Sequence, residues 1–139
     1  MAITMSNNVS GTFNSVDLSD HIREISVNMD ADDLDATGMG ATSKTHIPGL
    51  RDDRIEVTFL ADWAASKVDA TLAPLVGSAT GFPIVIKPTS AAVSTTNPSY
   101  TVTACLFNYQ PIDATVGEIS MPKVTFLPAP GSSIVRATS

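Results

Sequence analysis

Alternation of apolar and polar residues, repeated in one segment after another, is the feature that most restricts the fold of this chain. In the segment 22–29, the apolar residues Ile25, Val27 and Met29 alternate with Glu24, Ser26 and Asn28. A period of two places successive side chains on opposite faces of an extended strand, so one face can be buried while the other meets water. We expect this strand and further strands at 54–61, 82–88, 100–109, 119–128 and 133–138.

One segment departs from the alternation and predicts a helix over 62–76. Its apolar residues recur every three or four positions, as on one face of a helix. Asp62 is a suitable N-cap, Gly77 a suitable stop, and Pro74 limits how far the helix can run. We expect Trp63 to cover the core at the start of this helix. The fold class is therefore a mostly β, mostly antiparallel single domain over residues 1–139 with one helix packed on it.

The segment 35–54 shows almost no apolar periodicity and carries glycines at 38, 40 and 49. We expect it to be a long loop without regular structure. Loops of this length are uncommon in compact domains, and those that occur are usually functional.

Charge argues against a protein that grips nucleic acid. The chain has 14 acidic and 8 basic residues, a net charge of −6, whereas nucleic-acid binding requires basic groups facing phosphates. The same balance suits a surface that nucleic acid passes without adhering, because like charges repel. Charged residues make up only 16% of the chain, below the roughly 25% typical of soluble domains, which favours a surface partly covered by partners.

No catalytic, metal-binding or cofactor-binding motif is present in the sequence. There is no G-x-S-x-G, no C-x-x-C and no histidine pair at metal-ligand spacing, so we expect neither an enzyme nor a cofactor. The single cysteine, Cys105, is expected to be a small apolar residue within a strand. The acidic run 30–35 does not have the spacing of a calcium loop; it is either a solvated turn or a contact for Lys44, Arg51 or Arg54 of another copy.

Neither the N-terminal residues nor the interior of the sequence suggests export or membrane insertion. The first residues lack a basic start and a long apolar run, and no stretch approaches the roughly 20 apolar residues of a membrane helix. We expect the protein to be made in the cytoplasm and to have no membrane partner.

Several segments in order resemble the major tail tube proteins of long, non-contractile bacteriophage tails. The first three are DLSDHIREISV at 17–27, DLDATGMG at 33–40 and HIPGLRD at 46–52. The likeness continues through the predicted helix, through VIKPTSAAVSTTNPSYT at 85–101, and to VTFLPAPGSSIVRATS at 124–139. It covers nearly the whole chain, from about Asp17 to Ser139, although no single motif in it is specific.

The resemblance implies two packed antiparallel sheets flanked by a helix, with six copies forming a ring. In this family each copy contributes strands to one inner β-barrel, and rings stack into the tube of the virion tail, through which DNA leaves the capsid. The implied partners are other copies, the tape measure and tail terminator proteins, and genomic DNA passing without specific binding.

The family also gives roles to the two kinds of surface segment. Its long loop between early strands reaches a neighbouring subunit or ring, and the matching residues here are Asp35, Gly38, Met39, Gly40, Lys44, His46, Pro48, Gly49, Arg51 and Arg54. A channel for DNA needs polar side chains that are not strongly basic. The candidates for the channel lining are Glu24, Ser26, Asn28, Glu56, Thr58, Lys123 and Thr125.

Two alternatives remain open at this point. The polar positions of the strands are also what the solvated face of any half-buried sheet would carry, so a monomeric β-sandwich binding or decoration module fits the same pattern. The inner tube protein of a contractile injection machine shares the expected fold, and the sequence does not separate it from a non-contractile tail tube.

Overall fold

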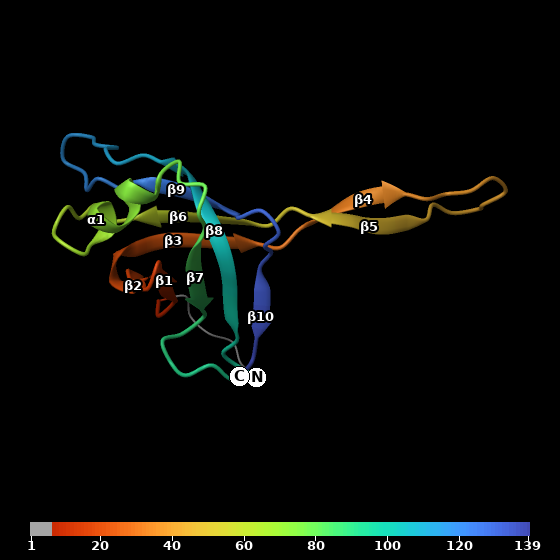
Figure 1. Ribbon diagram of the computed structural model, residues 1–139, viewed down its shortest axis with the longest axis horizontal. Helices are drawn as coiled ribbons and strands as arrows, with labels where there is room; N and C mark the ends of the chain where they lie inside the picture. Colours follow the sequence, from red (N-terminus) through yellow and green to blue (C-terminus); the bar gives the residue numbers. More distant parts are fainter. Residues whose placement is uncertain (1–6) are drawn as a thin grey trace.

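The computed structural model describes residues 7–139, and antiparallel strands account for most of its regular structure (Figure 1). The strands are β1 (Ser10–Phe13), β2 (Val16–Asp17), β3 (Ile22–Asn28), β4 (Ala31–Asp35), β5 (His46–Arg51), β6 (Arg54–Phe59), β7 (Phe82–Lys87), β8 (Ser99–Tyr109), β9 (Lys123–Pro128) and β10 (Val135–Ala137). One short α-helix, α1 (Val68–Leu72), lies between β6 and β7, and 3-10 turns occupy Ser19–His21 and Ala73–Leu75. The mostly β fold class predicted from the alternation is confirmed.

Eight of the strands form one continuous sheet in the order β2-β1-β7-β8-β9-β6-β3, with β10 added beside β8. The sheet folds over itself and brings strands that are not neighbours into contact. The centroid of the Phe13 ring on β1 lies 5.3 Å from that of Phe126 on β9 and 5.4 Å from that of Phe59 on β6. The two packed antiparallel layers are therefore halves of a single sheet. The eleven residues of β8 belong to both, since its first half pairs with β7 and β10 and its second half with β9.

The interior between the layers is filled by the apolar positions of the alternation. In β6, residues Ile55, Val57 and Phe59 are buried while the residues between them are exposed or half-buried. Strands β7 and β9 repeat this pattern around Phe82 and Phe126. Each large apolar side chain buried in this way contributes about 1.5–3 kcal/mol, so the packing of these rings is the main source of stability.

The alternation of β8 changes phase at a β-bulge between Leu106 and Asn108. Before the bulge Leu106 points into the core, and after it Tyr109 lies opposite the buried Val124. Phe107 at the bulge is 62% exposed, and Asn108 shares the outer face with Thr125. An extra residue in one strand of a pair has this effect, because every later side chain moves to the other face.

The prediction that 35–54 lacks regular structure is wrong for its ends. Residues 31–51 form a β-hairpin, β4 paired with β5, which projects from the body as a separate two-stranded sheet (Figure 1). Only its tip, 36–45, is without strand structure. Neither face of this hairpin packs on the core, so its strands need no apolar alternation and the sequence gives no signal of them.

The helix predicted over 62–76 is much shorter in the structure. Residues 62–67 are irregular, and Ser66 adopts a positive φ of 60°, which no helix interior allows. The carboxylate of Asp62 accepts the backbone N–H of Ala64 at 2.9 Å and so closes a local turn that precedes the helix. The expectation for Trp63 is also wrong, since that side chain is 58% exposed.

Two short strands, β1 and β2, were not predicted because four and two residues are too few to show a period. The predicted strand 119–128 begins only at Lys123, and the predicted strand 133–138 is limited to Val135–Ala137.

Candidate assembly surfaces

The seven candidate residues for a channel lining lie together on one face of three adjacent strands. Strand β6 lies between β3 and β9, and their register pairs Glu24 with Thr58 and Thr58 with Lys123. A second row runs from Ser26 through Glu56 to Thr125. Asn28 lies opposite Arg54 at the end of the same face. We call these seven residues, together with Asn108 of β8, the polar face.

Asn108 extends the polar face onto β8, and sequence reasoning missed it. It pairs with Thr125 and lines a shallow hollow of about 300 Å³ together with Glu24, Glu56 and Lys123. Uninterrupted alternation would have put Asn108 in the core, where an asparagine needs hydrogen-bond partners. An asparagine at a position where the alternation requires an apolar residue was therefore the feature of the sequence that could have indicated the bulge.

The charges on the polar face are mixed. Two carboxylates, Glu24 and Glu56, share it with Lys123 and with Arg54, whose Nη1 lies 3.4 Å from Oε1 of Glu56. The sequence had placed Arg54 both at the end of the long loop and at the start of the predicted strand 54–61; in the structure it is the first residue of β6, on this face. The layer therefore has two different sides. The outer side is polar and has no excess of basic residues, and the inner side is apolar, where Ile55 and Val57 contact the core.

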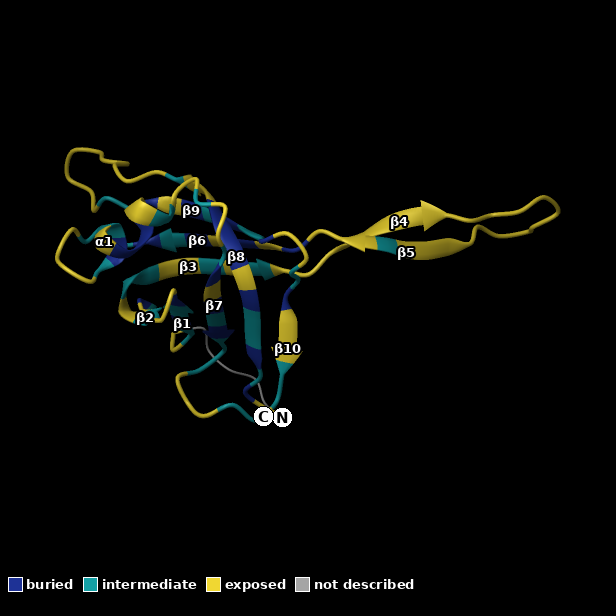
Figure 2. Cartoon of the chain, viewed as in Figure 1, coloured by how far each residue is buried: buried dark blue, intermediate teal, exposed yellow. Residues whose placement is uncertain are grey.

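The projecting hairpin holds nearly all the candidate residues for the long loop, and nearly all of them are exposed (Figure 2). Asp35 pairs with His46, whose Nδ1 lies 2.8 Å from Oδ1 of Asp33. Leu34 and Ile47 pair with each other and are about half exposed, at 52% and 49%. The strands contain Asp35, His46, Pro48, Gly49 and Arg51, and the tip contains Gly38, Met39, Gly40 and Lys44.

The root of the hairpin is held by one buried carboxylate, that of Asp53, which is 1% exposed. Its Oδ2 accepts the backbone N–H of Ile134 at 2.7 Å and the Nη2–H of Arg51 at 2.8 Å. Its Oδ1 accepts Nε–H of Arg51 at 3.1 Å and the backbone N–H of Asp30 at 3.2 Å. Both strands of the hairpin are thereby tied to the segment that precedes β10.

His21 joins the start of β3 to the segment after β6. Its Nδ1 lies 2.7 Å from Oδ1 of Asp20 and its Nε2 lies 2.8 Å from Oδ2 of Asp62. Partial burial acts to lower the pKa of His21, but the hydrogen bonds to the two carboxylates outweigh it and the pKa is raised above its ordinary value. The pKa of Asp62 is lowered, first by the N–H of Ala64 and then by His21. Both shifts favour an imidazolium between two carboxylates.

Helix α1 is fastened to the sheet by a second polar contact. The hydroxyl of Tyr109 donates to Oδ1 of Asp69 at 2.9 Å. Partial burial and this hydrogen bond raise the pKa of Tyr109, so the phenol stays protonated.

Residues 7–139 contain neither a cluster of metal ligands nor a membrane-spanning helix. No group of three or more His, Cys, Asp or Glu side chains in that range is arranged to hold a metal ion. None of the helices in the described range has the length and apolar character to cross a bilayer.

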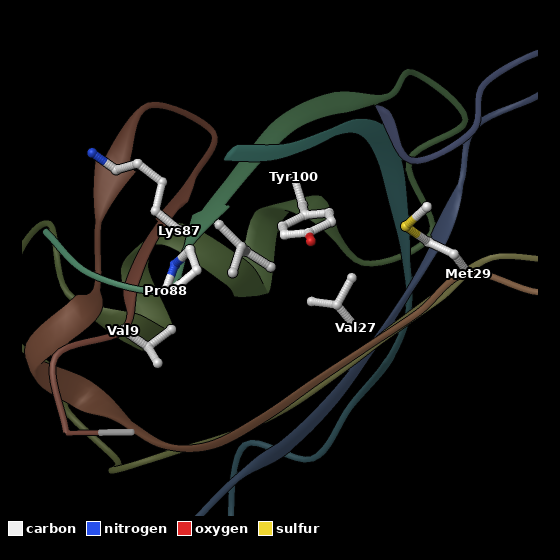
Figure 3. Close-up of a pocket in the computed structure, with 7 residues that line it drawn as sticks. Val9, Val27, Met29, Lys87, Pro88 and Tyr100 are labelled. Carbon is white, nitrogen blue, oxygen red and sulfur yellow. The ribbon is translucent and has the colours of Figure 1, made fainter. Parts of the chain in front are cut away.

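An apolar hollow opens beside the last residues of β3. It has a volume of about 370 Å³ and is lined by Val9, Val27, Met29, Ile86, Lys87, Pro88 and Tyr100. Val27 of β3 and Tyr100 of β8 face each other across it, with Met29 at one end and Val9 and Lys87 at the other (Figure 3). The two layers therefore do not close over their core at this edge.

Comparison by sequence finds no match: no family model matches the chain, and no curated protein does either. Comparison by structure does. A chain from the virion of a native gene transfer agent particle superposes with a TM-score of 0.74 at 8% identity, covering 96% of this chain and 99% of that one.

Two further solved structures are similar over almost the full chain. One belongs to the sheath-tube complex of an extracellular contractile injection system, with a TM-score of 0.69, 11% identity, and coverage of 99% and 93% of the two chains. The other is the SPP1 tail tube, with a TM-score of 0.71, 12% identity, and coverage of 99% and 80%. At such low identity the likeness establishes the fold: this chain has the fold of tail tube proteins.

Proposed function

We propose that this protein is a structural subunit of a phage tail tube, and that it assembles as stacked six-membered rings around a channel for DNA. The observation that carries the proposal is a sheet layer, buried on one side and polar on the other, within a fold shared with the SPP1 tail tube. Its role is assembly and not catalysis.

The polar face would line the channel. Four strands contribute to it, namely β3, β6, β9 and the second half of β8, so six copies would supply 24 strands. At about 4.8 Å between strands, the circumference is roughly 115 Å before strand tilt is counted. That bore admits a DNA duplex with water around it. Glu24 and Glu56 repel phosphate, while Lys123 and Arg54 keep the lining close to neutral.

The hairpin would reach a neighbouring subunit, in the same ring or the next one. Beyond its root it is a long arm that projects from the body formed by the other described residues, and it carries the exposed apolar residues Leu34, Met39, Ile47 and Leu50. Exposed apolar groups of this number on one projecting element are typical of contact surfaces. The acidic run on β4 belongs to the same surface.

The protein would act in the virion tail, in contact with further copies and with the proteins that end the tube or set its length. The inner tube of a contractile machine remains a second candidate, because the sheath-tube and sheath/tube terminator structures of a contractile injection system are similar to this chain as well. A monomeric binding module is disfavoured by the open edge of the sheet beside β3, which a lone domain leaves uncovered.

The test is assembly of the purified protein. We expect the mass measured by light scattering to rise with concentration beyond that of the 14.5 kDa chain, and negative-stain images to show rings or tubes of constant width. A single monomeric species at every concentration and salt condition would contradict the proposal. Tubes that bind an added contractile sheath protein would favour the second candidate.

A further inference from the structure

The layer that carries the polar face ends in two edges whose backbone groups are not paired by any strand in residues 7–139. One is the outer edge of β3, the last strand in the sheet order. The other belongs to the second half of β8. There, pairing with β7 ends at Ala104, one parallel bridge joins Val76 to Leu106, and no strand follows beside Phe107–Tyr109. Unpaired strand edges recruit other chains.

The edge of β3 borders a groove. A hollow of about 580 Å³ lies along its first half. Its lining is mixed: Val9, Ile22, Ile25 and Leu60 are apolar, and Asn7, Ser19, Arg23 and Glu24 are polar. The hollow of Figure 3 continues beside Val27 and Met29, and Val9 lines both. Exposed backbone therefore runs along β3 beside a groove that is mixed along the first half of the strand and mainly apolar beside Val27 and Met29.

The edge of β8 carries the complementary feature, which is exposed apolar surface. Phe107 is 62% exposed and Val76 47%. Both line a hollow of about 400 Å³ with Ala79, Cys105 and Pro130. A large aromatic side chain left in water at a strand edge favours burial against another chain, because its area dominates contact energies.

Strand direction decides which edges can meet. In the order β3-β6-β9-β8 every neighbouring pair is antiparallel, so β3 and β8 run in opposite directions. Rotation about a ring axis preserves the direction of every strand relative to that axis. The β8 edge of one copy and the β3 edge of the next are thus antiparallel wherever they meet, and an even number of strands per copy lets the ladder continue around a closed ring.

We propose that Phe107–Tyr109 of β8 in one copy pairs antiparallel with β3 of the adjacent copy, with Phe107 and Val76 packing at the groove beside β3. The contact is head-to-tail, since two different edges meet, and such contacts close into rings. It also aligns Asn108 with the row of polar side chains on the next β3. This inference rests on the proposed function and adds to it the identity of the two edges.

Cysteine pairs test the contact directly. Three double variants join Asn108→Cys on β8 with Glu24→Cys, Ser26→Cys or Asn28→Cys on β3. Within one copy these positions are separated by β6 and β9, roughly 14 Å at about 4.8 Å per strand spacing, too far for a disulfide. We expect oxidised assemblies of at least one pair to give a ladder of covalent multimers on a non-reducing gel. The three pairs cover the possible registers.

The matched control combines Asn108→Cys with Thr58→Cys, on the same face but on the inner strand β6. It keeps the buried native thiol of Cys105 and is expected to give no ladder beyond that of either single variant. Tubes that form normally while no β3–β8 pair links more than this control would overturn the edge assignment and leave the tube function standing. A protein that stays monomeric under all conditions would contradict both the edge assignment and the tube function.

Hydrogen exchange on the unaltered chain provides a second measurement that does not depend on the variants folding. On assembly we expect amides of β3 and of Phe107–Tyr109 to exchange at least about tenfold more slowly, while those of β6 and β9, already paired on both sides, change little. Unchanged exchange at both edges in assembled material would contradict the proposal.

Discussion

The carboxylate of Asp53 accepts the backbone N–H of Ile134 at 2.7 Å, across 81 positions of sequence. This bond joins the root of the hairpin to the segment that leads into β10, and Arg51 strengthens it by donating to the same carboxylate and, at 3.3 Å, to the carbonyl of Ile134. Three separate parts of the chain therefore depend on one buried anion.

Replacing Asp53 by alanine is expected to lower the free energy of unfolding by about 3 kcal/mol, because it leaves the N–H of Ile134 and the guanidinium of Arg51 without their acceptor. Thermal and denaturant unfolding measure the loss, and limited proteolysis at the hairpin root reports local loosening. Asp52→Ala is the control, since the contact of Asp52 with Asp30 uses its backbone N–H alone. Equal stability of the two variants would contradict the role given to Asp53.

Stability should depend on pH through His21. Its pKa is higher in the folded protein than its ordinary value, so the contribution of the imidazolium is fully present below about pH 6.5 and is lost as pH rises through the folded pKa. We expect the melting temperature to fall between pH 6 and pH 8.5 and this slope to be reduced in His21→Gln. His46→Gln is the control, because His46 contacts Asp33 on the exposed hairpin. A slope unchanged in His21→Gln would show that the pair with Asp62 does not stabilise the fold.

The tip of the hairpin can be removed without disturbing its strands. Replacing residues 36–45 by Asn-Gly joins the paired residues Asp35 and His46 through a two-residue turn. We expect a folded monomer with a melting temperature close to that of the parent, since the tip is exposed in the described part of the chain, and a large loss of tubes in negative-stain images. Normal tubes from this variant would mean that the tip has no part in assembly.

Reversal of charge on the polar face tests where it points. Glu24→Lys with Glu56→Lys changes the net charge by +4, and we expect tubes that still form but retain DNA in a salt-dependent manner and deliver it more slowly. Asp113→Lys with Glu118→Lys makes the same change on the exposed segment between β8 and β9 and serves as control. If both double variants slow delivery equally, net charge and not the channel lining is responsible.

The alternation was enough to predict the strands that bury one face, because Ile55, Val57 and Phe126 occupy the core positions their period requires. It also predicted seven residues of the polar face, all but Asn108, which lie together because residues on one side of neighbouring strands become neighbours. Their position in a channel stays a prediction.

The hairpin strands, the bulge and the contacts of Asp53 were not predicted, because none of them produces a periodic pattern of apolar residues. Strands β4 and β5 meet water on both faces, so their side chains are under no burial constraint. The bulge near Phe107 is set by pairing with β9. The role of Asp53 depends on Ile134, which only the folded chain brings near.

The hairpin contributes no side chain to the main apolar core, and this separates two demands that usually compete. Changes along 31–51 can retune which partner is recognised without weakening the body that presents them. Evolution can therefore alter the specificity of this subunit for its neighbours while its folding stays the same, and an engineer can graft a different arm at the same root.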